Sequence, residues 1–283
     1  MPSLRVAPIF ATILAATIVS GTAAAADTST WDGDTRSAIR LIGGGEAAQA
    51  GALRAGVEIR MSPGWKTYWR YPGDSGVPPN FDFGTSENVK SVDVQWPAPL
   101  RIADSEGVTI GYKSGVLFPL KVVPQDPNKP VVLRLKLDYA ICEKLCVPAQ
   151  GQAELAIKAG GPLAPAIATA EKMVPQPREL GAAAALAIRN VTREDGGKLP
   201  RILVDVAAPA GAKVTLFAEG PSPDWALPVP EMVDGAPAGL QRFAFALDGL
   251  PPGASAKGAE LKFTAVAAKE TILEAIETTF RLD

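Results

Sequence analysis

Hydrophobic and polar residues alternate along most of this chain with the two-residue period of β-strands, not the longer period of helices. In the clearest stretch, 131–141, every second residue from Val131 to Tyr139 is apolar, and Arg134 and Asp138 lie between them. Similar runs occur earlier and later in the first half of the chain, at 37–41, 52–61, 65–71, 89–96, 108–112, 116–123 and 153–157. Short strands separated by glycine- and proline-rich turns predict an antiparallel β-sandwich.

The strand pattern is interrupted after this first series. Glycine and proline mark the break at 160–162 and 175–177, and residues 163–174 between them are rich in helix-forming alanine, leucine and lysine. A second strand series follows at 185–191, 202–206, 213–218, 241–247, 261–267 and 271–282. We therefore predict an all-β chain with two sandwich domains in tandem. The expected boundaries are 27–159 for the first domain, 160–180 for a linker with a short helix, and 181–283 for the smaller second domain.

The N-terminus has the composition of an export signal. Arg5 precedes an apolar run over 6–19, and small residues follow at 21–26. This order of basic, apolar and small residues is typical of a cleaved signal peptide, expected here to span residues 1–26. No later segment approaches the ~18 unbroken apolar residues of a membrane helix. We expect a soluble exported protein whose cysteines meet an oxidising compartment.

Charge and composition exclude several classes of binding and catalysis. The formal net charge is −2, so no basic surface is expected to attract nucleic acid. The chain contains no histidine, which excludes Ser-His-Asp and Cys-His catalysis and the usual zinc and copper ligand sets. We expect no metal site and no small-molecule cofactor.

The only cysteines, Cys142 and Cys146, are separated by three residues at the end of the clearest strand. They can form a disulfide only if the chain curls back between them. A loop of ~5 residues closed in this way contributes only about 2 kcal/mol in the chain-entropy model. This spacing favours thiol–disulfide exchange, and a structural disulfide or a metal site with other ligands are the alternatives.

The region from Gly64 to Pro148 resembles the N-terminal periplasmic domain of DsbD-type thiol–disulfide reductases, including the related ScsB-type proteins. The segments that carry the resemblance are 64–70, 94–97, 111–114, 139–142 and 146–148. The resemblance implies an immunoglobulin-like fold and a redox-active Cys142–Cys146 pair. It also implies a membrane-embedded thiol reductase as electron donor. The implied acceptors are periplasmic thioredoxin-fold proteins, such as disulfide isomerases and cytochrome c maturation factors.

The same resemblance implies a cap loop over the disulfide, which would correspond to Ile110, Gly111 and Tyr112. The alternative is that Ile110 and Tyr112 pack inside a hairpin. The aromatic residues Tyr68 and Trp69, with Tyr139, are expected either to dock a partner or to belong to the core. The separation of the cysteines is shorter than in some members of the family.

The family's transmembrane conduit and C-terminal thioredoxin-like domain have no counterpart in this sequence. We expect either that a separate membrane protein supplies electrons or that the domain has been recruited for another task. The leading expectation is a component of a periplasmic protein-disulfide reductase system. One alternative is a two-domain adaptor or chaperone that keeps a structural disulfide. Another is a copper-handling protein that uses both thiolates and Met61.

Overall fold

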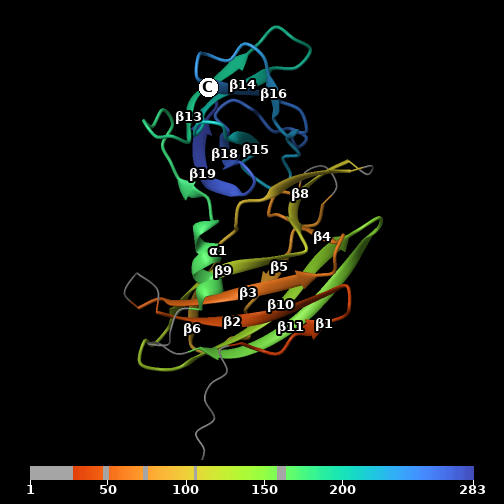
Figure 1. The fold of residues 1–283 in the computed structure, drawn as a ribbon, viewed down its shortest axis with the longest axis vertical. Coiled ribbons are helices and arrows are strands. Elements are labelled where there is room, and N and C mark those ends of the chain that lie inside the picture. The colour runs from red at the N-terminus through yellow and green to blue at the C-terminus, as the bar shows by residue number, and fades with distance from the viewer. Residues whose placement is uncertain (1–27, 47–50, 73–75, 105–106, 158–163) are drawn as a thin grey trace, which may run out of the picture.

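The structure is a computed structural model, drawn as a ribbon in Figure 1. The structure describes residues 28–46, 51–72, 76–104, 107–157 and 164–283. The expected signal peptide, 1–26, lies outside the described residues, as does the start of the expected linker. Figure 1 shows two β-rich bodies, one above the other, with a single short helix beside their junction.

The first body is built from two facing sheets. One sheet has the spatial order β1 (Asp32–Gly33), β2 (Ser37–Glu46), β3 (Leu53–Met61), β9 (Gly115–Pro124) and β6 (Val89–Val94). The other has the order β11 (Cys146–Ile157), β10 (Val131–Cys142), β4 (Lys66–Tyr68), β8 (Gly107–Lys113) and β7 (Leu100–Asp104), and β5 (Asn80–Asp82) also pairs with β10. Alternate residues of β3, β9 and β10 face inward, and their core includes Ile59, Phe118 and Leu133. We call this body the first sandwich.

The second body, the second sandwich, has two four-stranded sheets. One sheet has the order β12 (Gln176–Pro177), β19 (Ile272–Arg281), β18 (Glu260–Ala268) and β15 (Lys213–Glu219). The other has the order β13 (Ala187–Glu194), β14 (Arg201–Ala207), β17 (Leu240–Ala246) and β16 (Glu231–Val233). Phe245 and Phe263, from opposite sheets, pack with ring centroids 6.2 Å apart. The fold is therefore all-β and immunoglobulin-like, as predicted from the alternation.

Helix α1 (Pro165–Lys172) packs against the first sandwich. Its Ile167 side chain is fully buried and packs over Gly44, where an added Cβ atom would lie 2.7 Å from Ile167 Cδ1. Arg54 of β3 forms an ion pair with Glu171 at 3.0 Å. The helix expected between the two strand series is thus present and is attached to the first sandwich. Within the described ranges, no helix has the length and apolar character needed to cross a membrane.

The structure differs from the sequence-based expectation in the length of several strands. Strand β2 runs to Glu46, five residues beyond the expected 37–41. The aromatic run 65–71 is regular strand only at Lys66–Tyr68. The strand expected at 153–157 begins seven residues earlier, at Cys146. Pro148 is tolerated inside β11 because β11 is an edge strand of its sheet, where a missing N–H donor costs no ladder hydrogen bond.

Candidate functional site

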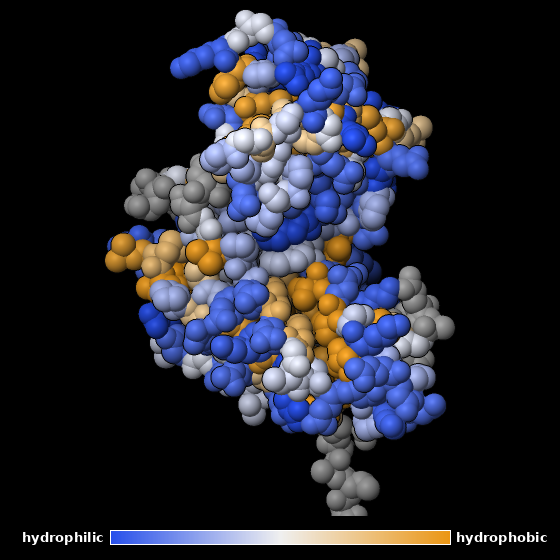
Figure 2. Space-filling view, turned by 180° about the vertical axis from the view of Figure 1, so that it is seen from behind, coloured by the Kyte–Doolittle hydropathy of each residue, from blue (hydrophilic) through white to orange (hydrophobic). Residues whose placement is uncertain are grey.

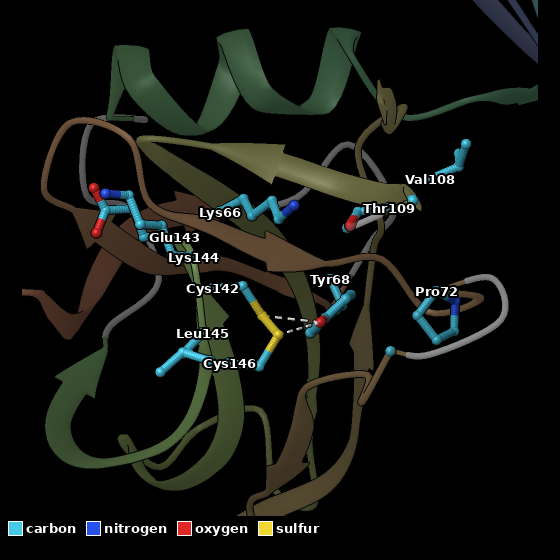
Figure 3. Close-up of a pocket in the computed structure, with 12 residues that line it drawn as sticks. Lys66, Tyr68, Pro72, Val108, Thr109, Cys142, Glu143, Lys144, Leu145 and Cys146 are labelled. Atoms are coloured by element: carbon cyan, nitrogen blue, oxygen red, sulfur yellow. Dashed lines mark hydrogen bonds between the residues drawn. A yellow bond between two sulfur atoms is a disulfide. The ribbon is translucent and has the colours of Figure 1, made fainter. Parts of the chain in front are cut away.

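The two cysteines face each other across a tight β-hairpin. Strand β10 ends at Cys142, β11 begins at Cys146, and these residues are direct partners in the antiparallel register. Their Cα atoms are 4.1 Å apart and their sulfurs form a disulfide bond (Figure 3). The three intervening residues, 143–145, form the exposed turn. The short spacing is therefore accommodated by a hairpin, which supplies the reversal of the chain that a disulfide requires.

The two sulfur-bearing residues differ sharply in exposure. Cys142 is only 2% exposed, because β10 has a neighbour on each side: Cys146 in β11 and Lys66 in β4. Cys146 starts an edge strand and is exposed. An incoming thiolate can therefore approach Cys146 from solvent, while Cys142 is shielded. This asymmetry assigns different roles to the two cysteines in an exchange reaction.

Tyr68 covers the disulfide from β4. Its hydroxyl oxygen lies 2.9 Å from Cys142 Sγ and 3.1 Å from Cys146 Sγ, as the dashed lines in Figure 3 show. Disulfide sulfurs carry no hydrogen, so the hydroxyl is the donor. The tyrosine is 5% exposed, so it excludes water from one side of the S–S bond. It is also placed to donate to a thiolate formed when the bond opens.

A cavity of about 350 Å³ adjoins the disulfide. Lys66, Tyr68 and both cysteines line it on one side, with Glu143, Lys144 and Leu145 from the turn; Pro72 and Thr109 lie across it in Figure 3. Leu145, between the cysteines, is 79% exposed. Figure 2 shows further hydrophobic residues reaching the surface of the lower half of the molecule, the first sandwich. A protein partner docked at the hairpin would meet an apolar side chain next to the accessible sulfur.

The structure corrects the expected cap loop. Ile110, Gly111 and Tyr112 are interior residues of β8, and Ile110 and Tyr112 point into the core. The Tyr112 hydroxyl donates to the Pro97 carbonyl oxygen at 2.8 Å, and burial raises the pKa of Tyr112 well above its ordinary value. These side chains pack inside the sandwich, as the alternative interpretation held, and the residue that covers the sulfurs is Tyr68.

The expected docking residues are buried as well. Trp69 belongs to the core, and so does Tyr139, whose hydroxyl is 2.9 Å from the Ser37 hydroxyl. Burial raises the pKa of Tyr139, and the hydrogen bond from Ser37 partly opposes that shift. Neither side chain forms an exposed surface for a partner. Of the three residues, only Tyr68 belongs to the disulfide site.

Lys66 was missed in the sequence, and Tyr68 was named there without its contact to the sulfurs. Lys66 lies opposite Cys142 in the register, and Tyr68 contacts both sulfurs. The alternation within the aromatic run 65–71 could have indicated both residues, because it places Lys66 and Tyr68 on one face of the strand and Thr67 on the other. Among the described residues there is no group of three or more acidic, cysteine or histidine side chains arranged to hold a metal ion.

Removing the Tyr68 hydroxyl tests its action on sulfur. Hydrogen bonds to charged groups contribute about 1.5–3 kcal/mol, and 1.4 kcal/mol corresponds to a factor of about ten. We expect Tyr68→Phe to destabilise the reduced dithiol form, so that the equilibrium with glutathione moves toward the disulfide by about tenfold. The fraction of reduced protein across a series of glutathione ratios measures the shift. An unchanged equilibrium would show that the hydroxyl does not stabilise the thiolate.

Comparisons with known proteins match part of the sequence and most of the fold. Residues 40–158 match the family model described as "Thiol:disulfide interchange protein DsbD, N-terminal". The solved N-terminal periplasmic domain of ScsB from Proteus mirabilis matches with a TM-score of 0.66 and 17% identity, covering 90% of this chain and 98% of that one. No curated protein sequence matches significantly. Residues 40–158 are therefore similar in sequence to the N-terminal domain of DsbD, in line with the resemblance noted in the sequence, and the ScsB domain has the same fold.

Proposed function

We propose that this chain is a periplasmic thiol–disulfide interchange protein whose Cys142–Cys146 pair carries electrons from a membrane-embedded thiol reductase to thioredoxin-fold proteins. The observation that carries the proposal is the asymmetry of the disulfide, with an exposed Cys146 beside a buried Cys142. The Tyr68 hydroxyl contacts both sulfurs. This arrangement supplies one sulfur for attack and one stabilised leaving group.

These positions determine how the membrane reductase would reduce the Cys142–Cys146 disulfide. A thiolate of the reductase attacks Cys146 Sγ, the S–S bond breaks, and Cys142 leaves as a thiolate that accepts a hydrogen bond from Tyr68. The second thiolate of the reductase then attacks the reductase sulfur of the mixed disulfide, and Cys146 leaves as a thiolate. The reductase is oxidised to a disulfide, and this chain gains two electrons as a dithiol.

When the electrons pass on to a thioredoxin-fold protein, this chain becomes the attacking dithiol. The Cys146 thiolate attacks the disulfide of a thioredoxin-fold protein and forms a mixed disulfide, releasing one thiolate of that partner. Cys142 then attacks Cys146 Sγ, the bond to the partner breaks, and the partner leaves as a dithiol. The Cys142–Cys146 disulfide is restored, and the two electrons now reside on the partner. Disulfide isomerases and cytochrome c maturation factors are the proposed acceptors.

A purely structural role fits the hairpin poorly. Strands β10 and β11 are already paired without interruption from Val131–Ile157 to Cys142–Cys146. A crosslink at the closed end of this ladder adds only about 2 kcal/mol, since the loop it closes has ~5 residues. Stabilisation would be served better by a bond between the two facing sheets, as in antibody domains. The position of the pair therefore favours exchange.

The reduction potential of purified protein tests the proposed function. Equilibration against glutathione or dithiothreitol buffers, followed by alkylation and mass spectrometry, gives the fraction of dithiol. We expect a value between about −120 and −270 mV, the range of catalytic periplasmic dithiols. A value below about −300 mV is that of a structural disulfide and would replace this proposal with the adaptor or chaperone alternative.

We also propose export through a signal peptide that spans residues 1–26, with 27–159 and 181–283 as separate domains joined by the linker 160–180. The composition of 1–26 supports the first proposal, and the two pairs of sheets support the second. N-terminal sequencing of protein recovered from the periplasm tests the cleavage. A mature N-terminus upstream of residue 20, or retention of Met1, would contradict it.

A further inference from the structure

The strand that places Tyr68 over the disulfide continues directly into contacts with the second sandwich. Trp69 is fully buried, and its ring packs against Phe217 of β15 with centroids 5.7 Å apart. The Arg70 guanidinium lies 4.2 Å over the Trp69 ring. It donates to both carboxylate oxygens of Glu219, at 2.9 and 2.7 Å, and also to Glu277 of β19. One arginine of the first sandwich is thus bound by two carboxylates of the second.

Electrostatics favour this ion pair although it is largely removed from water. Burial opposes the charge of Arg70, but the hydrogen bond and charge of Glu219, together with Glu277, outweigh it and raise the pKa of Arg70 above its ordinary value. The guanidinium therefore stays charged. Breaking such a pair from one side leaves a partly buried charge without its partner, which costs more than an exposed salt bridge.

Tyr71 adds a second attachment. Its hydroxyl donates to the Trp225 carbonyl oxygen and accepts a hydrogen bond from the Leu227 N–H at 2.7 Å. Both backbone groups belong to the second sandwich, in the segment that follows β15. We refer to Trp69, Arg70 and Tyr71 together as the anchor. Through it, three consecutive residues of the first sandwich are fixed to the second.

The site residues lie on both sides of the anchor in the sequence. Tyr68 precedes it, and Pro72 and Gly76, which line the cavity at the disulfide, follow it. A Cβ atom at Gly76 would lie 2.6 Å from Tyr68 Cδ1 and 2.1 Å from Pro72 Cβ, so the Gly76 backbone packs directly on the Tyr68 ring. The ring is thus held between the sulfurs and the backbone of Gly76, which follows the anchor in the sequence.

The first sandwich holds the backbone of Tyr68 through β8 alone. The paired residues of β4 and β10 stop one residue before Tyr68, although β10 continues alongside it and packs against its side chain. In β8, Gly111 is the ladder partner of Tyr68. Ile110 of β8 accepts a backbone hydrogen bond from Trp69 at 3.0 Å and donates one to Pro72 at 3.3 Å. A residue at the end of a three-residue strand, with a ladder partner on one side, has few ladder hydrogen bonds to fix it.

We propose that the second sandwich is a positioning element of the redox site: through the anchor it holds the Tyr68 hydroxyl against both sulfurs and so sets the equilibrium between disulfide and dithiol. Arg70 and Tyr71 are the positioning residues, and they act through Tyr68. This inference rests on the proposed exchange function and gives the cysteine-free second sandwich a role in it.

The test compares anchor variants of the full chain in their redox equilibrium with glutathione. Tyr71→Phe removes the two hydrogen bonds to the second sandwich with little loss of volume, and Arg70→Gln removes the ion pair. We expect each variant to shift the equilibrium toward the disulfide by about three- to tenfold, since part or all of the Tyr68 hydrogen bond is lost. The absorbance of the first thiolate should also appear at higher pH.

Two matched controls separate positioning from general damage. Tyr112→Phe is the same substitution at a buried tyrosine whose hydroxyl bonds within the first sandwich. Arg101→Gln removes another ion pair between the sandwiches, to Glu231 at 2.5 Å, from β7 instead of the anchor. Both controls should keep the wild-type equilibrium. Equal shifts in controls and anchor variants would overturn the proposal.

A double-mutant cycle tests the route through Tyr68. If the anchor acts by placing the Tyr68 hydroxyl, then Tyr71→Phe should shift the equilibrium in the wild type and cause no further shift in a Tyr68→Phe background. The same shift in both backgrounds would overturn the proposal. If Tyr71→Phe does not fold, as judged by near-ultraviolet circular dichroism, Glu277→Gln removes one carboxylate of the ion pair and replaces it in the cycle.

Failure of this inference is distinguishable from failure of the proposed function. If the wild-type disulfide resists reduction by the glutathione buffers throughout, the exchange function fails. If the wild type exchanges normally and the folded anchor variants match it, exchange stands and the second sandwich has no influence on the site.

Discussion

A Cys142→Ser variant is expected to accumulate a stable mixed disulfide with a thioredoxin-fold protein, whereas a Cys146→Ser variant should form almost none. The reason is exposure. Cys146 begins an edge strand and faces solvent, while Cys142 is shielded between β4 and β11 under the Tyr68 hydroxyl. In Cys142→Ser the accessible thiol can attack a partner disulfide, but the resolving thiol that would release the partner is missing.

The measurement incubates each reduced variant with oxidised thioredoxin and resolves the products on a non-reducing gel, with mass spectrometry of the trapped species. We expect the yield from Cys142→Ser to exceed that from Cys146→Ser by on the order of tenfold or more, in line with the dependence of exchange on access to the thiolate. The double variant Cys142→Ser/Cys146→Ser is the blank. Equal trapping by both single variants would show that burial of Cys142 in this structure does not govern attack.

The regular strands of the first sandwich were predictable because one face of each is buried. In β10 the buried positions from Val131 to Tyr139 repeat every second residue, and from Arg134 onward polar side chains fill the positions between them. The length of β11 was not predictable in the same way. It is an edge strand with Pro148 and Gly151 in its interior, and both residues usually argue against a strand. Gly151 is needed there because a Cβ atom would lie 2.5 Å from Ile39 of the facing sheet.

The cysteine pair was also identifiable from sequence, but the residues around it were not. Alternation places Tyr68 and Trp69 on opposite faces, yet it does not say which of them faces the sulfurs, because that depends on the register between β4 and β10. A resemblance to the family pointed to 110–112 as the cover, and the register of β8 instead turns Ile110 and Tyr112 inward. Contacts such as Arg70–Glu277 join residues far apart in sequence, and no local pattern signals them.

Gly111→Ala is expected to be the most destabilising single substitution near the site. Gly111 lies opposite Tyr68 in the β4–β8 register, and a Cβ atom added there would lie 1.9 Å from the Thr67 carbonyl oxygen. That oxygen cannot move aside easily, because Thr67 is fully buried and its hydroxyl is bonded to the Ala140 carbonyl at 2.8 Å. Relief of the clash must separate β4 from β8, so we expect a loss of about 3 kcal/mol in the free energy of unfolding, the upper end of typical overpacking costs.

Gly115→Ala is a graded control in β9, the next strand along the chain, which lies in the facing sheet. A Cβ atom at Gly115 would lie 2.9 Å from the Ile59 carbonyl oxygen, a contact that a small backbone shift relieves, so we expect a cost of about 1 kcal/mol. Urea unfolding followed by tryptophan fluorescence measures both variants. Because separation of β4 from β8 also withdraws Tyr68 from the sulfurs, Gly111→Ala should shift the glutathione equilibrium toward the disulfide, as Tyr68→Phe does, while Gly115→Ala should not. Equal stability of the two variants would show that β4 does not approach β8 as closely as this register requires.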